Sequence, residues 1–400
     1  MQVIVAGAGP GAVEFYTEKM KTAVAAADVV ITSERLAEPM RELNDNVVVA
    51  GVMETVDYLR KNASSDETVC VAASGDTGFY SIASTIGKNL PEGVEAEFLC
   101  GISSMQYFAS VTGIGYEDMK LISLHGKNGS AVPFVCYNKK VFALTGGRIK
   151  AEDVIQELCD AGLDQVRVHV GEALTAENQR LLSGTAAELS GENFDDLTVM
   201  IIENDHAADR YRTLSDADFV RGRTPMTKAA VRDLSVARLE IHPDDVVYDI
   251  GAGTGSVTCA MALKASDSFV YAVEKEEDAA ALIRENMEKL GVRNIRLVCG
   301  TAPEAMEDFP PADKVFIGGS TGSLSEIVSR VLSDNEMAVI LVTAVTLETL
   351  TEAVELFKSI GLEYSVSCIN VSNAQRLGNY DLMKAENPVY MIRGDKKFEG

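Results

Sequence analysis

Short apolar runs recur along this chain, and stretches with helical spacing separate them. In the first half, strands are predicted at Val3–Ala6, Asp28–Thr32, Thr68–Ala73, Ala96–Leu99, Lys120–Leu124, Val141–Leu144, Gln165–Val170 and Leu197–Ile202. These runs lack strict alternation of apolar and polar residues, which is typical of sheets covered on both faces. The spacing changes after about residue 112, and Pro133 and Gly146-Gly147 add breaks. This half is therefore predicted to form two α/β lobes.

A polar segment, 203–223, separates these runs from a second series and is predicted to be a linker. Seven further strands are predicted near 246–250, 269–274, 295–299, 314–318, 337–343, 363–371 and 388–393. Helical patterns separate the first six strands. A loop without a helical pattern joins the last two, which predicts an antiparallel final strand. The predicted domains are 1–205 and 223–400, with a linker at 206–222. The second domain resembles the seven-stranded Rossmann-like methyltransferases.

Composition narrows the function classes. The chain has 400 residues, of which 46% are hydrophobic, and a formal net charge of −24. Such a charge disfavours nucleic acid and anionic membranes as partners. No Cys-x-x-Cys pair occurs among the seven cysteines, and the four histidines lie far apart, so neither a disulfide framework nor a metal site is predicted. The N-terminus opens directly into a strand, and no apolar run reaches 18 residues, so we expect a soluble, cytoplasmic protein.

The stretch 246–255 carries the clearest chemical signal. It is a β-branched strand, then an acid, then a Gly-x-Gly-x-Gly turn before an apolar helix. Glycines there let the backbone turn sharply and approach a ligand. Glu274 ends the next strand, near the offset of about 20 residues at which an acid meets a ribose hydroxyl. This pattern suits an adenosine ligand without a pyrophosphate, such as S-adenosylmethionine; a tight turn without a ligand is the alternative. The predicted cofactor residues are Asp249, Gly251, Gly253, Gly255 and Glu274.

A second glycine loop, Gly7–Ala12, follows the first predicted strand. Its Gly-x-Gly-x-x-Ala spacing, with Glu34 after the second strand, by itself favours NAD or FAD. Pro10 stiffens this turn, and a Gly-Pro-Gly loop explains the pattern equally well. An oxidoreductase therefore stays one alternative for this half.

Two further segments of the first half are Ser74–Tyr80 and Cys100–Gln106. Together with Gly7–Gly11 and Ser123–Lys127 they resemble the tetrapyrrole methylase family, although that family usually has proline where this chain has Thr77, and often where it has Cys100. The resemblance implies an extended ligand in the cleft between two lobes. It also implies that S-adenosylmethionine is held by Gly75, Asp76, Ser103 and Ser104, and that Gly9, Pro10 and Gly11 face the substrate.

Four segments of the second half, 223–232, 300–304, 313–320 and 387–390, resemble the decarboxylating precorrin methyltransferases. The order of the halves is similar to that of the fused precorrin-6Y carbon-5,15 methyltransferases of cobalamin biosynthesis. The resemblance implies two S-adenosylmethionine sites, methylation of carbon 5 by the first half, and methylation of carbon 15 with loss of the ring C acetate carboxylate by the second. It further implies precorrin-6Y, precorrin-6B or their cobalt forms as substrates, a homo-oligomer, and cofactor contacts from Thr227, Thr301 and Ala302.

Such a substrate carries many carboxylates, so its binding to an acidic chain must be local. Five cations, Arg221, Arg223, Lys228, Arg232 and Arg238, lie between residues 219 and 239, where Asp233 alone opposes them. We interpret them as a carboxylate-binding lip in which Lys228 and Arg232 share a helix face; a solvated helix face is the alternative. The loop 376–384 is a second, weaker candidate, and Gly318 and Gly319 are predicted to let the substrate approach the backbone.

No catalytic proton donor is assigned from the sequence. Three further hypotheses stay open at this point. The chain is a methyltransferase pair acting on another small molecule or on RNA, an NAD- or FAD-dependent oxidoreductase, or a scaffold in which one half has lost its activity.

Overall fold

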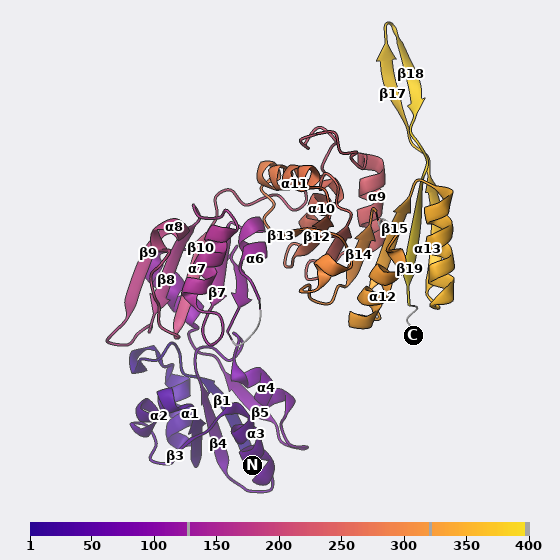
Figure 1. Ribbon diagram of the computed structural model, residues 1–400. Helices are drawn as coiled ribbons and strands as arrows, with labels where there is room; N and C mark the ends of the chain where they lie inside the picture. The colour runs from indigo at the N-terminus through magenta and orange to yellow at the C-terminus, as the bar shows by residue number, and fades with distance from the viewer. Residues whose placement is uncertain (126–128, 320–321, 397–400) are drawn as a thin grey trace. The chain divides into compact units, whose positions relative to one another are not determined.

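The computed structural model describes residues 1–125, 129–319 and 322–396. Its chain divides into two compact units (Figure 1). Unit 1 comprises Met1–Ala131 and Lys139–Asn204, and unit 2 comprises Val132–Asn138 and Asp205–Gly400. The domain limits given above stay a prediction, and the short segment 132–138 in unit 2 was not anticipated.

Unit 1 contains two five-stranded sheets, which confirms the two predicted α/β lobes. The first sheet is parallel, in the order β3-β2-β4-β1-β5, and the second is mixed, in the order β6-β7-β10-β8-β9. The strands are β1 (Gln2–Gly7), β2 (Val29–Thr32), β3 (Val47–Val49), β4 (Thr68–Ala73), β5 (Ala96–Leu99), β6 (Lys120–Ser123), β7 (Lys140–Leu144), β8 (Arg167–Glu172), β9 (Arg180–Thr185) and β10 (Thr198–Glu203). The helices are the 3-10 turn η1 (Val13–Phe15), α1 (Glu18–Ala26), α2 (Glu34–Arg41), α3 (Val52–Lys61), α4 (Ile82–Lys88), α5 (Ser104–Thr112), α7 (Ala151–Asp160) and α8 (Ala186–Leu189).

Unit 2 is built on a seven-stranded sheet in the order β13-β12-β11-β14-β15-β19-β16. Its strands are β11 (Val247–Ile250), β12 (Val270–Glu274), β13 (Ile295–Cys299), β14 (Lys314–Ile317), β15 (Val339–Ala344), β16 (Glu363–Ile369) and β19 (Val389–Asp395). Its helices are α6 (Val132–Tyr137), α9 (Ala229–Leu239), α10 (Ser256–Lys264), α11 (Glu277–Leu290), η2 (Glu304–Met306), α12 (Leu324–Asp334) and α13 (Leu347–Ser359). The last strand, β19, is antiparallel to both β15 and β16, as predicted.

Both faces of this sheet are covered. Successive residues of β15 point into different cores, because Leu341 belongs to one hydrophobic cluster while Ile340 and Val342 belong to the other. Residues of α9, α10 and α11 complete the first cluster, and residues of α12 and α13 complete the second. Figure 1 shows the corresponding helix layers on either side of the strands. In the part of the chain that the structure describes, no helix is both long and apolar enough to cross a membrane.

The prediction of a loop between the last two strands is wrong in one respect. It forms a hairpin of β17 (Ser372–Leu377) and β18 (Tyr380–Ala385), which extends away from the sheet of unit 2 (Figure 1). Every residue of both strands is exposed, so no buried face imposes the alternation by which strands are recognised in a sequence. The pairing of the two strands positions Lys384 opposite Asn373 at the base of the hairpin.

Helix α6 belongs to unit 2 although its sequence lies within the first half of the chain. Tyr137 is only 7% exposed, and its hydroxyl donates to a side-chain oxygen of Asn294 (2.7 Å) and lies 3.0 Å from the carbonyl oxygen of Ala262. The neighbouring Cys136 is buried, and its thiol contacts the carbonyl oxygen of Gly291. The core of unit 2 is therefore completed by a segment that precedes β7.

We expect Tyr137→Phe to lower the free energy of unfolding of unit 2 by about 1–3 kcal/mol, because a buried hydrogen-bonding oxygen of Asn294 loses its donor. Calorimetry of the full chain measures this change without a tryptophan probe, since the chain has none. Tyr116→Phe is the matched control, because Tyr116 is 44% exposed. Equal effects of the two substitutions would show that the hydroxyl of Tyr137 does not stabilise unit 2.

Candidate functional site

The glycine turn of unit 2 lies where two neighbouring strands end. Gly251 follows β11 with a φ of 75°, in the left-handed region that favours glycine. A Cβ atom on Gly251 would lie 2.6 Å from the carbonyl oxygen of Gly319, which follows β14. Since β11 and β14 are adjacent parallel strands, their two carboxyl-end turns approach at backbone distance. Ligands of open α/β sheets bind at such carboxyl ends.

Glu274 fixes this turn from the neighbouring strand β12. Its carboxylate accepts hydrogen bonds from the backbone N–H of Gly253 (2.7 Å) and of Glu276 (2.9 Å). The side chain is 7% exposed and lines the first cavity described below. The predicted acid therefore lies beside the glycine turn and lines the same cavity.

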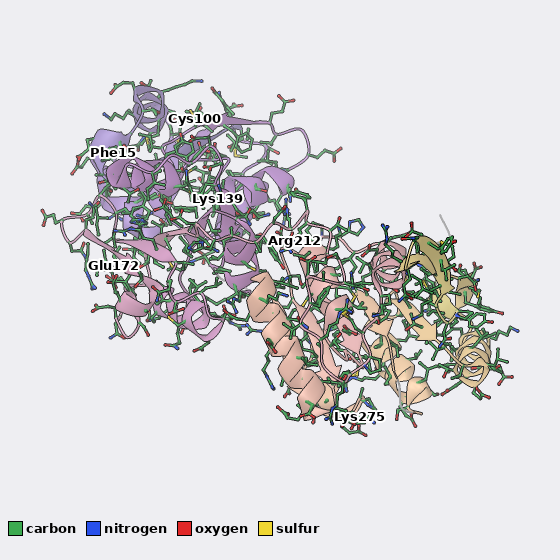
Figure 2. All side chains as sticks on the ribbon, turned by 90° about the horizontal axis from the view of Figure 1, so that it is seen from above. Phe15, Cys100, Lys139, Glu172, Arg212 and Lys275 are labelled. Carbon is green, nitrogen blue, oxygen red and sulfur yellow. The ribbon has the colours of Figure 1, made fainter. Side chains whose placement is uncertain are left out.

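Two cavities open at this edge of the sheet. The first, of about 200 Å³, is lined by five of the predicted residues: Gly251, Glu274, Thr301, Ala302 and Gly319. Lys275, labelled in Figure 2, lines the same cavity next to Glu274. The second, of about 810 Å³, is also lined by five of them: Thr227, Lys228, Gly251, Gly253 and Gly318. Because Gly251 lines both, the predicted cofactor and substrate residues are brought to one place.

The residues of the first cavity fit an adenosine ligand. A Cβ atom added to Gly319 would meet nothing within 4 Å, so the backbone is open to a ligand there. Glu274 supplies carboxylate oxygens of the kind that accept from ribose hydroxyls. Gly255, the third predicted glycine, is placed differently: it caps α10 at a φ of 75° and packs against Ile283 rather than lining either cavity.

The predicted ligand contact of Asp249 needs correction. Its side chain is 0% exposed, and its carboxylate accepts a hydrogen bond from the Thr258 hydroxyl (2.5 Å) in α10. Burial raises the pKa of Asp249 to about 7, the bond from Thr258 opposes this shift, and the charge of Glu274 adds to it. Asp249 therefore positions the start of α10 beneath the turn and does not reach the cavity.

This buried acid makes the stability of unit 2 depend on pH. The folded state keeps the proton of Asp249 up to a pKa of about 7, whereas the unfolded chain releases it near 3.8. The free energy of unfolding therefore falls as the pH rises from about 4 to 7, by at most about 4 kcal/mol. Asp249→Asn is expected to remove this dependence and to stabilise unit 2 at pH 8, as measured by calorimetry across that range. Asp244→Asn, at an exposed position, is the control, and parallel profiles for both variants would contradict the role of burial.

The predicted substrate contact of Arg232 also needs correction. Its side chain is 0% exposed in α9 and points inward. The guanidinium donates to the carbonyl oxygens of Leu214 (2.5 Å) and Thr227 (3.3 Å). It also pairs with Asp216 (3.2 Å) and lies 4.8 Å from the centre of the Phe219 ring. The two terminal nitrogens of Arg232 are therefore held by partners within unit 2, and its side chain does not share an exposed face with Lys228.

The other cations of the predicted lip are accessible but dispersed. Arg221, Arg223 and Arg238 are exposed, and none of them lines either cavity. Lys228 does line the larger cavity, and Lys384 from the base of the hairpin lines it as well. The two cations at this cavity therefore come from the N-cap of α9 and from the second, weaker candidate segment.

In unit 1 the loops after β1 and β4 are joined directly. The backbones of Gly9 and Gly75 exchange two hydrogen bonds of 3.2 and 2.8 Å. The carboxylate of Asp76 accepts from the backbone N–H of Gly78 (2.8 Å) and Gly101 (3.0 Å), which ties in the loop after β5. The predicted substrate loop and the two predicted cofactor loops therefore form one assembly.

A cavity of about 250 Å³ adjoins this assembly. Three predicted residues line it, namely Pro10, Gly75 and Ser104. Ser103 is 2% exposed and caps α5 by accepting from the backbone N–H of Gln106, so its side chain serves the helix. Three other predicted residues do not line this cavity. Asp76 and Gly9 hold the loops together, and Gly11 packs near Thr175.

Several residues of these cavities were not identified from the sequence. Arg35, Phe79 and Tyr80 line the cavity of unit 1, and Asn373, Gln375 and Glu386 line the larger cavity of unit 2. No motif marks the hairpin residues, because their place depends on how the chain folds back. Two predicted motifs extend beyond the described residues: Gly126 and Lys127 of the segment 123–127, and Ser320 of the segment 313–320, lie outside them.

Comparison with known proteins assigns a family to each half. Residues 2–190 match the tetrapyrrole (corrin/porphyrin) methylases, and residues 218–396 match the precorrin methyltransferase domain. This chain is 42% identical to a probable cobalt-precorrin-6B C(15)-methyltransferase (decarboxylating) from Pyrobaculum calidifontis. The match spans 170 residues, which are 42% of this chain and 87% of that relative. It is 29% identical to a precorrin-6Y C(5,15)-methyltransferase [decarboxylating] from a Sinorhizobium species. That match spans 329 residues, which are 80% of this chain and 78% of the relative. A crystal structure of precorrin-6y C5,15-methyltransferase from Geobacter metallireducens GS-15 has 36% identity, covers 46% of this chain and 97% of that one, and has a TM-score of 0.44.

Proposed function

This chain belongs to the precorrin methyltransferase family, with a tetrapyrrole methylase half before the decarboxylating half, and from this premise we propose that it methylates a late corrin precursor at carbons 5 and 15. Unit 1 methylates carbon 5. Unit 2 methylates carbon 15 and removes the carboxylate of the ring C acetate as carbon dioxide. The observation that carries this proposal is the meeting of the glycine turn, Glu274 and the loop 300–302 at one cavity beside a larger one.

Each unit holds its own S-adenosylmethionine in this proposal. The bound cofactor supplies an electrophilic methyl group to an electron-rich carbon of the macrocycle. The protein contributes position, since alignment of donor and acceptor is worth about 7–11 kcal/mol of the barrier. In unit 2, Glu274 and the backbone of Gly251 and Gly319 orient the cofactor in the smaller cavity, which adjoins the larger one at Gly251.

The larger cavity of unit 2 suits a polycarboxylate macrocycle. Its volume of about 810 Å³ is within the range of pockets that enclose a small molecule. Lys228 and Lys384 supply ammonium groups for carboxylates, and Phe316, Val257 and Val389 supply apolar contacts. These two lysines replace Arg232 as the cations that hold the substrate of unit 2.

The dinucleotide alternative for the first half is not retained. Residues 2–190 match the tetrapyrrole methylases, and the backbone of Gly9 is already engaged with Gly75 rather than open for a pyrophosphate. An RNA substrate is disfavoured by the net charge of −24.

Mass spectrometry tests the proposal. The full chain is incubated with precorrin-6Y, or with its reduced cobalt counterpart, and labelled S-adenosylmethionine. The expected product gains two methyl groups and loses one carbon dioxide. Gain of one methyl with loss of carbon dioxide would leave only unit 2 active, and gain of one methyl without that loss would leave only unit 1 active. No change with either substrate would contradict the proposal.

We also propose that the chain forms a homo-oligomer through the hairpin β17–β18. Three of its apolar residues, Leu377, Leu382 and Met383, are between 53% and 68% exposed, which is unusual for a projecting element without a partner. Sedimentation of the wild type and of Leu382→Asp should show a smaller particle for the variant. A monomeric wild type would contradict this assembly.

A further inference from the structure

The geometry points to Arg35 as the residue that binds a carboxylate of the tetrapyrrole substrate in the cavity of unit 1. This inference rests on the proposed function, because it names a substrate contact for the methylation of carbon 5. No motif of the sequence singles out Arg35, and the cations considered from the sequence all lie in the second half of the chain.

The position of Arg35 follows from α2, which begins directly after β2 at the carboxyl end of the first sheet. One guanidinium nitrogen donates to the carbonyl oxygen of Pro10 (3.3 Å), and the other terminal nitrogen donates to the hydroxyl of Ser74. Arg35 thereby reaches both the loop after β1 and the loop after β4. It lines the cavity of about 250 Å³ together with these two residues.

The charge of this cavity favours an anion. Among its described lining residues, Arg35 is the sole lysine or arginine, and none is an aspartate or glutamate. The nearest loop carboxylate, that of Asp76, is already held by the backbone N–H groups of Gly78 and Gly101. In a chain with a net charge of −24, a cavity with one cation and no acid in its wall selects for a negatively charged ligand.

The guanidinium of Arg35 has unused donors, and the residue is exposed to solvent at the cavity. A guanidinium carries five N–H donors in a planar fork that matches a carboxylate, and the two bonds of Arg35 leave part of that fork open. Burial lowers the pKa of Arg35, while the nearby Tyr16 opposes that shift. A carboxylate ligand would oppose this downward shift, because an opposite charge favours the protonated guanidinium.

A purely structural role for Arg35 is the competing explanation, because its two bonds join two loops. Those loops, however, have other connections. The backbones of Gly9 and Gly75 exchange two hydrogen bonds, and the backbone N–H of Ala12 donates to the hydroxyl of Thr175 (3.1 Å). The loop assembly is therefore expected to survive the loss of the Arg35 side chain.

The test uses the full chain and compares Arg35→Gln, Arg35→Lys and the wild type. Arg41→Gln is the matched control, because Arg41 lies on the same helix, is exposed and does not line the cavity. The KM and kcat of carbon-5 methylation are measured with the natural substrate and with a derivative whose carboxylates are converted to neutral amides. Affinity of unit 1 for S-adenosylhomocysteine is measured in parallel by calorimetry.

We expect Arg35→Gln to raise KM about tenfold to a hundredfold with little change in kcat or in S-adenosylhomocysteine affinity. Arg35→Lys should recover part of the loss, Arg41→Gln should behave like the wild type, and with the amide substrate the wild type and Arg35→Gln should be equal. The inference is overturned if KM is unchanged, or if the same difference persists with the amide substrate, which would indicate a structural role. A wild type that fails to methylate carbon 5 overturns the proposed function itself, and is recognised before any variant is compared.

Discussion

Gly251→Ala is expected to abolish methylation at carbon 15 and the accompanying decarboxylation, while methylation at carbon 5 continues. The φ of 75° at this position costs a residue with a side chain about 1–2 kcal/mol. The larger effect is steric. The new Cβ atom would lie 2.6 Å from the carbonyl oxygen and 2.8 Å from the nitrogen of Gly319, and backbone atoms cannot rotate out of the way.

The turns after β11 and β14 must therefore separate in this variant, and both turns line the cavities of unit 2. A displacement of about 1 Å between reacting groups can lower a rate about 100-fold. We expect at least that loss at carbon 15, together with weaker S-adenosylhomocysteine binding to unit 2. Mass spectrometry reports the expected product directly, as a gain of one methyl group without loss of carbon dioxide.

Gly361→Ala separates the steric effect from backbone strain. Gly361 has a φ of 74°, but a Cβ atom there would meet nothing within 4 Å. This control should lose some stability and retain carbon-15 methylation. If both variants lose the activity equally, the approach of Gly251 to Gly319 is not what shapes the site.

A strand could be predicted from the sequence where it buries apolar residues in a core. The seven strands of the main sheet of unit 2 were all predicted, because each contributes apolar residues to a core. Two strands of unit 1 were missed. β3 is only three residues long, and β9 is a sheet-edge strand with mostly exposed residues. The hairpin β17–β18 was missed for the same reason, since it buries nothing within its own chain.

The candidate site was predictable at its glycines and less so at its charges. A glycine at a turn is a local signal, because the left-handed conformation of Gly251 is set by its own backbone. Whether a charged side chain faces a ligand or the core depends on distant partners. Asp249 is covered by Thr258 from the following helix. Arg232 is paired with Asp216, which precedes the cation-rich segment 219–239.

Replacing the buried arginine of α9 is the second change with a large expected effect. Arg232→Ala is expected to lower the free energy of unfolding of unit 2 by about 3–5 kcal/mol, rather than to weaken substrate binding selectively. The substitution removes a fully buried guanidinium that donates to the carbonyl oxygens of Leu214 and Thr227 and pairs with Asp216. It removes one donor from each of these groups, although Asp216 and Thr227 keep bonds from Ala229 and Ser256, and it opens a space beside Phe219.

The effect should reach the larger cavity through Thr227. This residue lines that cavity, and its carbonyl oxygen accepts from Arg232. Loss of the bond weakens the attachment of the segment that leads into α9, so carbon-15 activity should decline together with thermal stability. Arg238→Ala is the matched control, because Arg238 is exposed on the same helix and its loss should change stability by less than about 0.5 kcal/mol.

Two measurements separate a structural Arg232 from a substrate-binding one. Calorimetry of the full chain gives the unfolding temperature of unit 2, and steady-state kinetics give KM for carbon-15 methylation at a temperature where the variant is folded. A structural role predicts a lowered unfolding temperature and a KM close to that of the wild type. A variant that unfolds at the wild-type temperature but has a strongly raised KM would show that Arg232 binds the substrate. In that case the side chain would have to leave its partners in α9 and the preceding segment when the substrate binds.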